Sequence, residues 1–376
     1  MQEERRMILK MIEDGTISAE EGIKLLTALG EKEADKKTES ASSASSTTTT
    51  HSHEVSQHVD VDRRTDTGYK QSEEKMSGFA SKFSEFVDDA VNKIKELDLD
   101  FNFGSAQQVQ HVFQHKDVFL KEADIHIENG SIELRPWNEK DIRIECDVQV
   151  YRVRSAEEAR REFLRDAQFS FSNGKLRLES RKKTMKVNTV IYFPTDDLEK
   201  IKLYTFNGKI SGEEIPVHVF SLKAVNGKVN FSRIDAKEVA IETVNGTIDL
   251  GRLNAVDGSL KTMNGTVRVE AARGNIDAES VNGSIYYHLS EPSQSKAYVK
   301  TTTGSIHVYV PNNAKTEGEL KSTVGSINCH LPTMSVIEEK KEFANKRLTF
   351  IANKEGDGHF YIEAEAATGS VNVKNS

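Results

Sequence analysis

The sequence lacks the features that would place it among secreted, membrane-spanning or nucleic-acid-binding proteins. It has only two cysteines in 376 residues, Cys146 and Cys329, which are too few for a disulfide framework. No stretch approaches the roughly 20 consecutive apolar residues of a membrane-spanning helix, and no apolar run follows the N-terminus as a signal peptide requires. The net charge of −8 argues against a nucleic-acid partner, which needs a concentrated basic face. These absences together predict a cytoplasmic protein.

Motifs of known catalytic chemistry are also missing. The sequence contains no Gly-x-Ser-x-Gly nucleophile elbow, no metal-ligand cluster and no phosphate-binding loop. Three histidines, at positions 51, 53 and 58, fall in a Ser/Thr-rich tract and are better explained as incidental than as a metal site. We therefore expect no catalytic residues, no cofactor and no metal, with a β-helix carbohydrate-active enzyme as the alternative.

What the sequence does contain is a repeat. Nine times between residues 129 and 371, a Gly is followed by Ser, Thr or Lys and then by Ile or Val. From Gly208 the successive intervals are 19, 19, 19, 18, 21 and 21 residues. A fixed period of this size predicts repeated supersecondary units. Six of the glycines follow an asparagine: Asn129, Asn207, Asn226, Asn245, Asn264 and Asn282.

Alignment of the units on the glycine exposes apolar columns on both sides of it. The intervening positions are mostly polar, and this alternation with period 2 predicts two short strands per unit, each with one buried face. The column four residues before the Asn, or its equivalent, is Leu203, Leu222, Ile241, Leu260, Ala278, Val299 and Leu320. The column two residues after the Gly is Ile210, Val229, Ile248, Val267, Ile285, Ile306 and Ile327.

Two architectures suit such a unit. Asn-Gly favours a tight hairpin turn, so each repeat could be an antiparallel hairpin; alternatively, each repeat is one rung of a β-solenoid with Asn-Gly at a corner. In the column three before the Asn, the charge alternates in sign over five successive units, as expected of neighbours on parallel rungs. With the near-constant period, this favours a mainly β protein built as a β-solenoid. The five residues are Lys223, Glu242, Lys261, Glu279 and Lys300.

The chain divides into four regions. Residues 1–30 are predicted to form a helical hairpin, with a capping box at Ser18. Residues 31–71 are rich in Ser and Thr and are predicted to be a disordered linker. Residues 72–100 follow as an amphipathic helix, and residues 115–376 as the β-strand-repeat domain, regular over about 201–330.

The amphipathic helix carries Phe79, Phe83 and Phe86 on one face, which we regard as a candidate face for packing against a partner. Packing over the exposed end of the repeat stack, or self-association with a second copy, is the favoured role. Because the segment from Glu73 to Asp98 has a net charge of −3, anionic lipid would repel it, so peripheral membrane contact is the weaker alternative.

One polar column is the candidate binding face of the repeat domain. It lies three residues after the Gly and includes Asn230, Asp249, Arg268, Tyr286 and His307. A carboxylate, a guanidinium, a phenol and an imidazole on one stripe could bind a glycan or a peptide. The alternative interpretation is an ordinary solvated strand face.

These motifs carry a family resemblance. The opening Glu-Glu-Arg-Arg-Met-Ile-Leu-Lys-Met-Ile-Glu-Asp-Gly-Thr-Ile-Ser-Ala-Glu-Glu-Gly resembles the short helical (SHOCT-like) module of YvlB- and LiaX-like bacterial proteins. The Asn-Gly-[Lys/Thr/Ser]-[Ile/Val] repeats are similar to the toast-rack, or "putative adhesin", β-strand region of the same proteins.

The resemblance implies a non-enzymatic scaffold or regulator of a cell-envelope stress response. Its repeat face would bind, and its N-terminal hairpin would recruit a membrane or regulatory protein of that response. It also implies an antimicrobial peptide as an alternative ligand, and a surface adhesin reached by non-classical export as an alternative to a cytoplasmic protein.

Overall fold

The computed structural model describes four stretches of the chain: residues 83–94, 105–196, 198–342 and 345–376. The predicted hairpin at 1–30, the linker at 31–71, and the parts of the amphipathic helix at 72–82 and 95–100 lie outside these stretches.

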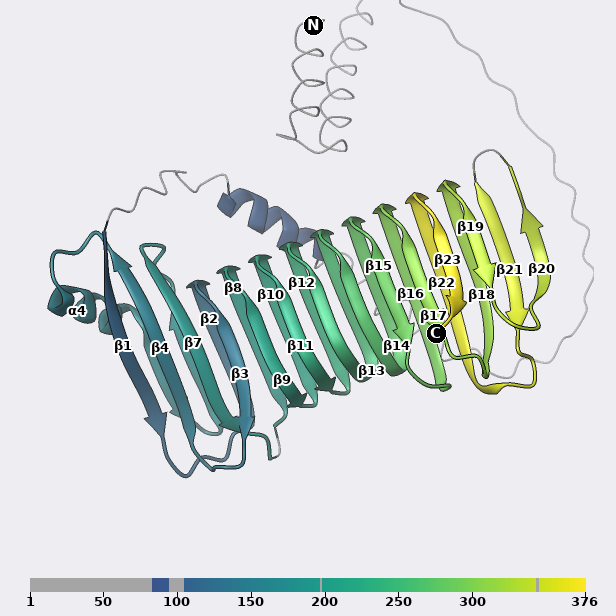
Figure 1. Cartoon of the computed structure of the whole chain (residues 1–376). Coiled ribbons are helices and arrows are strands. Elements are labelled where there is room, and N and C mark those ends of the chain that lie inside the picture. Colours follow the sequence, from purple (N-terminus) through teal and green to yellow (C-terminus); the bar gives the residue numbers. More distant parts are fainter. Residues whose placement is uncertain (1–82, 95–104, 197, 343–344) are drawn as a thin grey trace, which may run out of the picture. The chain divides into compact units, whose positions relative to one another are not determined.

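The described strands form a β-solenoid with two walls that face each other across a common core (Figure 1). The first wall contains the strands that end at the corner glycines, together with four strands at its two ends. In spatial order it consists of β5 (Gln168–Ser172), β6 (Lys175–Ser180), β2 (Glu122–Asn129), β8 (Lys200–Asn207), β10 (Val219–Asn226), β12 (Glu238–Asn245), the second halves of β13 (Ile248–Asn264) and β14 (Val267–Asn282), β16 (Gln294–Thr303), β22 (Asp357–Thr368), β18 (Ala314–Val324), β21 (Lys346–Ala352) and β20 (Ser335–Lys340).

The second wall contains the strands that follow the corners, together with β1, β4 and β7 at one end. In spatial order it consists of β1 (Ala106–His115), β4 (Ile142–Tyr151), β7 (Met185–Pro194), β3 (Ile132–Trp137), β9 (Ile210–Pro216), β11 (Val229–Asp235), the first halves of β13 and β14, β15 (Ile285–Leu289), β17 (Ile306–Val310), β23 (Val371–Asn375) and β19 (Ile327–His330).

The pairing decides between the two architectures that the sequence left open. The strands on either side of a corner pair with neighbouring rungs: β8 pairs in parallel with β2 and β10, and β9 pairs in parallel with β3 and β11. The Asn-Gly pairs are therefore corners between walls. The prediction of a mainly β solenoid with two short strands per unit is confirmed.

The predicted apolar columns point into the core. Leu222, Ile241 and Ile248 are fully buried, as are their equivalents in the rungs that lie between two others. The exceptions are Ile327 and Cys329 on β19, which are only half-buried because β19 is the last strand of its wall. Cys329 therefore lies at the rim of the core.

The order of the rungs differs from the order of the chain. The C-terminal rung, β22 and β23, lies between the β16–β17 rung and the β18–β19 rung. The units at Gly304 and Gly325, which are consecutive in the aligned columns, are therefore not spatial neighbours. The unit at Gly369 separates them, because the chain passes over one position and returns to fill it.

The predicted charge column is confirmed, and the inserted rung extends it. Lys223, Glu242, Lys261, Glu279 and Lys300 are register neighbours in that order. Glu365 then lies opposite both Lys300 and Lys321, so the sign alternates where the chain order alone would place two lysines together. Ion pairs join Lys223 to Glu242 at 2.7 Å and Lys300 to Glu365 at 3.4 Å.

A helix closes the N-terminal end of the core. Helix α4 (Ala156–Asp166) buries Ala159 and Phe163 and packs against β1 and β4. The Ser155 side chain accepts a hydrogen bond from the Glu158 amide, and the Glu158 carboxylate accepts one from the Arg154 amide. A repeat stack needs such a cover because its end rung otherwise leaves apolar side chains in water.

The 83–94 helix packs on the side of the first wall. Phe86 and Ala90 are buried against an outward apolar column formed by Phe206, Val225 and Val244. Packing over the end of the stack, as expected from the sequence, is therefore wrong for this part of the helix. The wall offers it an apolar stripe one residue before each corner Asn, which a helix can cover laterally.

Candidate binding face

The corners hold successive rungs in register through a ladder of amide side chains. Asn207 donates from Nδ2 to Oδ1 of Asn129 at 2.9 Å, and the same bond recurs from Asn226 to Asn207, from Asn245 to Asn226, from Asn264 to Asn245 and from Asn282 to Asn264. Because each amide both donates and accepts, the ladder fixes the relative height of the strands that follow it. The outward side chains of the second wall consequently form straight rows.

The five predicted residues form one such row. Along β11, β13, β14, β15 and β17, each of the five is the direct register neighbour of the next: Asn230, Asp249, Arg268, Tyr286 and His307. The next neighbour of His307 is Asn372 on the inserted rung, and Asn328 follows after it. The structure thus brings all five residues together, and their role in binding remains a prediction.

Aromatic and cationic groups in this row contact one another. The rings of Tyr286 and His307 are stacked, with centroids 4.8 Å apart and planes 7° from parallel. The Arg268 guanidinium lies over the other face of Tyr286, 5.4 Å from its centroid. Because these contacts occupy ring faces, the row offers edges and polar atoms to a ligand. Burial, assisted by nearby Lys374, lowers the pKa of His307, which favours its neutral form.

A second row lies beside the first and was missed in the sequence. Five residues after the Gly, the chain places Glu270, His288, Tyr309 and Lys374 on neighbouring strands. His288 meets Tyr309 edge to face at 6.0 Å, and the Lys374 ammonium lies 5.0 Å from the Tyr309 centroid. The sequence does contain a signal for this second row, because its residues recur with the same period as the first row, two positions further from the Gly.

The two rows together make a polar platform rather than a pocket. They offer hydroxyl, imidazole, guanidinium and ammonium donors together with the carboxylates of Asp249 and Glu270, and Glu270 lies 4.0 Å from the His288 ring. In the part of the chain that the structure describes, no group of three or more His, Cys, Asp or Glu side chains is arranged to hold a metal.

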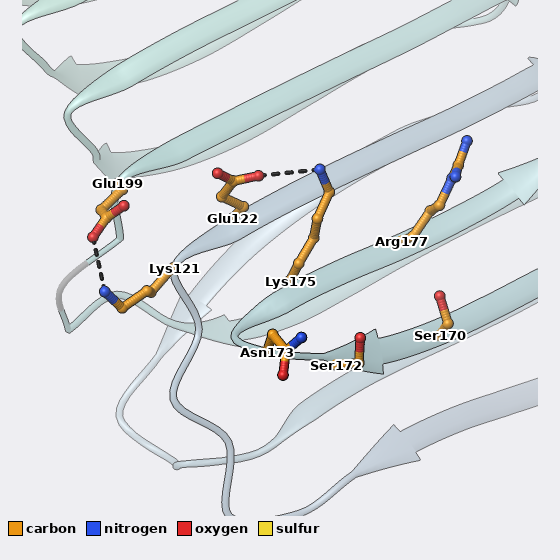
Figure 2. A pocket seen from close by; sticks show the side chains of 8 residues that line it. All are labelled: Lys121, Glu122, Ser170, Ser172, Asn173, Lys175, Arg177 and Glu199. Atoms are coloured by element: carbon orange, nitrogen blue, oxygen red, sulfur yellow. Dashed lines mark hydrogen bonds and ion pairs between the residues drawn. The ribbon is translucent and has the colours of Figure 1, made fainter.

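A hollow of about 460 Å³ lies elsewhere, where β5, β6 and the starts of β2 and β8 meet (Figure 2). Its lining includes Lys121, Lys175 and Arg177. Two of these cations are paired across it, Lys121 with Glu199 and Lys175 with Glu122, each at 3.1 Å. Arg177 is paired with Glu179 at 3.3 Å. The positive charges that line the hollow are therefore largely neutralised by neighbouring carboxylates.

Comparison with known proteins identifies the architecture. The family model described as Toastrack DUF4097 matches residues 131–374. The chain belongs to this toastrack family. A SHOCT-like domain model matches residues 3–34 of the same chain. The chain is also similar to YvlB of Bacillus subtilis (strain 168), with 38% identity over 376 residues and full coverage of both chains.

Solved structures also match this chain, at lower sequence identity. A "putative adhesin" from Bacteroides fragilis is 13% identical, covers 72% of this chain and 97% of its own, and has a TM-score of 0.38. A "putative cell adhesion protein" from Clostridium sporogenes is 10% identical, covers 72% of this chain and 100% of its own, and has a TM-score of 0.26. No helix in the described stretches of the toastrack chain is long and apolar enough to cross a bilayer.

The predicted helical face is occupied by the toastrack wall itself. Phe86 is buried, and the Lys223 ammonium lies 4.7 Å from its ring centroid. Phe83 is partly buried against the same cluster. Phe79 lies outside the described residues. In this arrangement the face of Phe83 and Phe86 contacts the chain's own β-domain, so a partner would have to compete for it.

The toastrack wall also contains a buried charge cluster. Lys261 is 2% exposed and lies 3.2 Å from the Asp277 carboxylate and 3.1 Å from that of Glu279. Burial raises the pKa of Asp277 to about 6; the Glu279 charge adds to this shift and Lys261 opposes it. Burial alone would lower the pKa of Lys261, but the two carboxylates outweigh it and raise that pKa.

Asp277→Asn should remove a pH dependence of stability. Between the ordinary pKa of 3.8 and the folded value of about 6, the folded state binds more protons at this carboxyl than the unfolded state. The free energy of unfolding therefore falls as pH rises through this window, by at most about 3 kcal/mol from this group. Urea unfolding at pH 4 and pH 7 should show a smaller decrease in D277N than in the wild type. An equal decrease in the free energy of unfolding of both proteins would contradict the raised pKa of Asp277.

Proposed function

We propose that this protein is a non-enzymatic binding component of a bacterial cell-envelope stress response. In this proposal the platform of the second wall binds one partner, and the N-terminal module recruits another. The observation that carries it is the continuous outward row from Asn230 to His307, held straight by the Asn ladder on a rigid wall. Binding residues placed on a rigid scaffold lose little conformational entropy when they bind.

The spacing within the row favours binding over glycan cleavage. Asp249 and His307 are three rungs apart, which is about 14 Å at the usual strand spacing. Glycosidases typically use two carboxyl groups that lie roughly 5–9.5 Å apart, whereas His307 supplies no carboxyl group. Asp249 is moreover 3.6 Å from the Lys228 ammonium, which neutralises it. These distances support a recognition surface made of separate contacts.

The assignment to an envelope stress response rests on family resemblance. A SHOCT-like match at residues 3–34 and full-length similarity to YvlB support a two-part protein in which the N-terminal module and the repeat domain act together. Envelope-stress membrane or regulatory proteins are the proposed partners, and an antimicrobial peptide or a glycan is the alternative ligand of the platform.

Cross-linking in a Gram-positive host under cell-wall stress would test both halves of this proposal. Tyr286→Ala with His307→Ala should reduce the cross-links made by the platform several-fold. Deletion of residues 1–30 should abolish the cross-links to the partner that the N-terminal module recruits. It should leave the β-structure intact, as measured by circular dichroism. Tyr298→Ala is the matched control, because Tyr298 is a partly exposed tyrosine on the opposite wall. Unchanged cross-links in the double variant, or loss of β-structure in the deletion, would contradict the proposal.

A further inference from the structure

The two ends of the solenoid present four edge strands, and one of them differs from the others. Strand β19 has only four residues, and β5 has five. Strand β20 carries Glu338, Glu339 and Lys340 and has a register irregularity after Val336. Short strands, charged side chains and bulges are the usual means by which proteins prevent edge-to-edge association. Strand β1 has none of them.

Strand β1 is ten residues long and contains no Asp, Glu, Lys, Arg, Pro or Gly. Strand β1 pairs with β4 over all ten positions, and no other described strand pairs with its second edge (Figure 1). Val109, His111 and Phe113 are buried or half-buried on its inner side, whereas Gln110 and Val112 are exposed on its outer side. A long, uncharged free edge of this kind is a template for another strand.

We propose that β1 pairs with β1 of a second copy of this chain, antiparallel, about a two-fold axis at His111. Inner residues must oppose inner residues across a ladder, which restricts the register. With the axis at His111, Val109 lies opposite Phe113 of the second copy, and Gln110 lies opposite Val112. Gln108 then lies opposite Gln114. No charged side chain of either strand opposes another, so self-pairing carries no electrostatic penalty.

The strand count at this end leaves room for the second copy. Beyond the β2–β3 rung, the second wall continues through β7, β4 and β1, whereas the first wall continues only through β6 and β5. Strand β1 therefore projects one strand position past β5, and helix α4 packs against β1 and β4 at this end. Two second walls can join at β1 into one continuous sheet without collision of the two β5 strands. Such a contact uses the same surface on both copies, as a closed two-fold dimer requires.

Exposed apolar side chains cluster at the same end. Val112 is 47% exposed on β1, and Leu164 is 42% exposed on α4, the helix that packs against β1. Pairing of the edges would cover Val112 with Gln110 of the second copy and would bring the two α4 helices toward each other. The proposal is independent of what the platform of the second wall binds.

Sedimentation velocity of the full chain over a range of concentrations tests the dimer. Gln108→Lys combined with Gln114→Lys would place like charges opposite each other twice across the axis, and should weaken the dimer at least tenfold. Folding should be retained, because Gln108 and Gln114 are both exposed on the outer side of the strand. The matched control is Val256→Lys with Ile337→Lys, which adds the same charge at exposed sites elsewhere.

Disulfide trapping tests the register. In a mixture of one chain carrying Gln110→Cys and another carrying Val112→Cys, the two thiols lie directly opposite each other and should cross-link under mild oxidation. Each chain alone should cross-link far less. The native thiols should react slowly, because burial raises the pKa of both Cys146 and Cys329 to about 12. A chain that stays monomeric, a dimer that the lysine pair does not weaken, or cross-linking that is equal in single chains and mixture would overturn the proposal.

Discussion

Removal of residues 357–376 should destabilise the β-domain by far more than the loss of a terminal rung. These residues supply β22 and β23, which lie inside the stack between the β16–β17 and β18–β19 rungs. Four large apolar side chains are fully buried there: Phe360, Ile362, Val371 and Val373. At about 1.5–3 kcal/mol each, they contribute roughly 6–12 kcal/mol, which is comparable to the whole stability of a typical domain. Circular dichroism and urea unfolding of the truncated chain should show loss of cooperative structure.

A pair of identical substitutions tests the same point in a chain that still folds. Ile362→Ala lies late in the sequence but inside the stack, and should cost about 2–5 kcal/mol. Ile327→Ala lies earlier in the sequence but on the last strand of the second wall, where the side chain is already half-exposed, and should cost clearly less. Urea midpoints measure both. If Ile327→Ala were the more damaging change, the C-terminal rung would not be internal.

Local periodicity predicted the fold well because each rung repeats the same physical requirement. One inward residue before the corner and one after it must be apolar in every unit, and these columns are buried as expected, from Leu222 to Ile306. The alternating column from Lys223 to Lys300 was predicted for the same reason, since neighbouring rungs place equivalent residues directly opposite each other.

The order of the rungs could not be obtained from the period, because the period describes each unit and not its neighbours. A signal was nevertheless present. The charge column breaks at Lys300 and Lys321 when the units are stacked in chain order, and Glu365, three residues before the corner of the last unit, restores the alternation. Charge complementarity between units therefore carries information on stacking order that hydrophobic periodicity lacks.

The lateral position of the 83–94 helix also had a signal in the sequence. Phe206, Val225, Val244 and Met263 precede the corner asparagines on a face that is otherwise polar. An apolar column facing outward requires a cover, and an amphipathic helix is one available in the chain. For the candidate binding face, the period correctly placed the row from Asn230 to His307. It could not predict the stacking of Tyr286 on His307, which depends on rotamers.

Substitution of a corner glycine should be among the most damaging single changes in the protein. In Gly265→Ala, the added Cβ would lie 2.0 Å from the carbonyl oxygen of Gly246 on the neighbouring rung. That oxygen is backbone and cannot rotate away, and the corner is also held by the amide ladder between Asn264 and Asn245. The rungs would have to separate at the corner, at a cost of about 3 kcal/mol or more. The urea midpoint should fall accordingly.

Gly258→Ala is the matched control, because it adds the same methyl group at a glycine of β13 away from the corner. There the nearest atoms to the new Cβ are side-chain ends, Cδ1 of Ile276 at 2.8 Å and Cδ2 of Leu253 at 3.4 Å. Both groups can rotate, so the expected loss is within about 1.5 kcal/mol. The requirement for glycine at the corners would then follow from the close approach of backbones in adjacent rungs. Equal losses in the two variants would mean that the corners tolerate a side chain, and that the rungs are spaced more loosely than the hydrogen-bonded ladder implies.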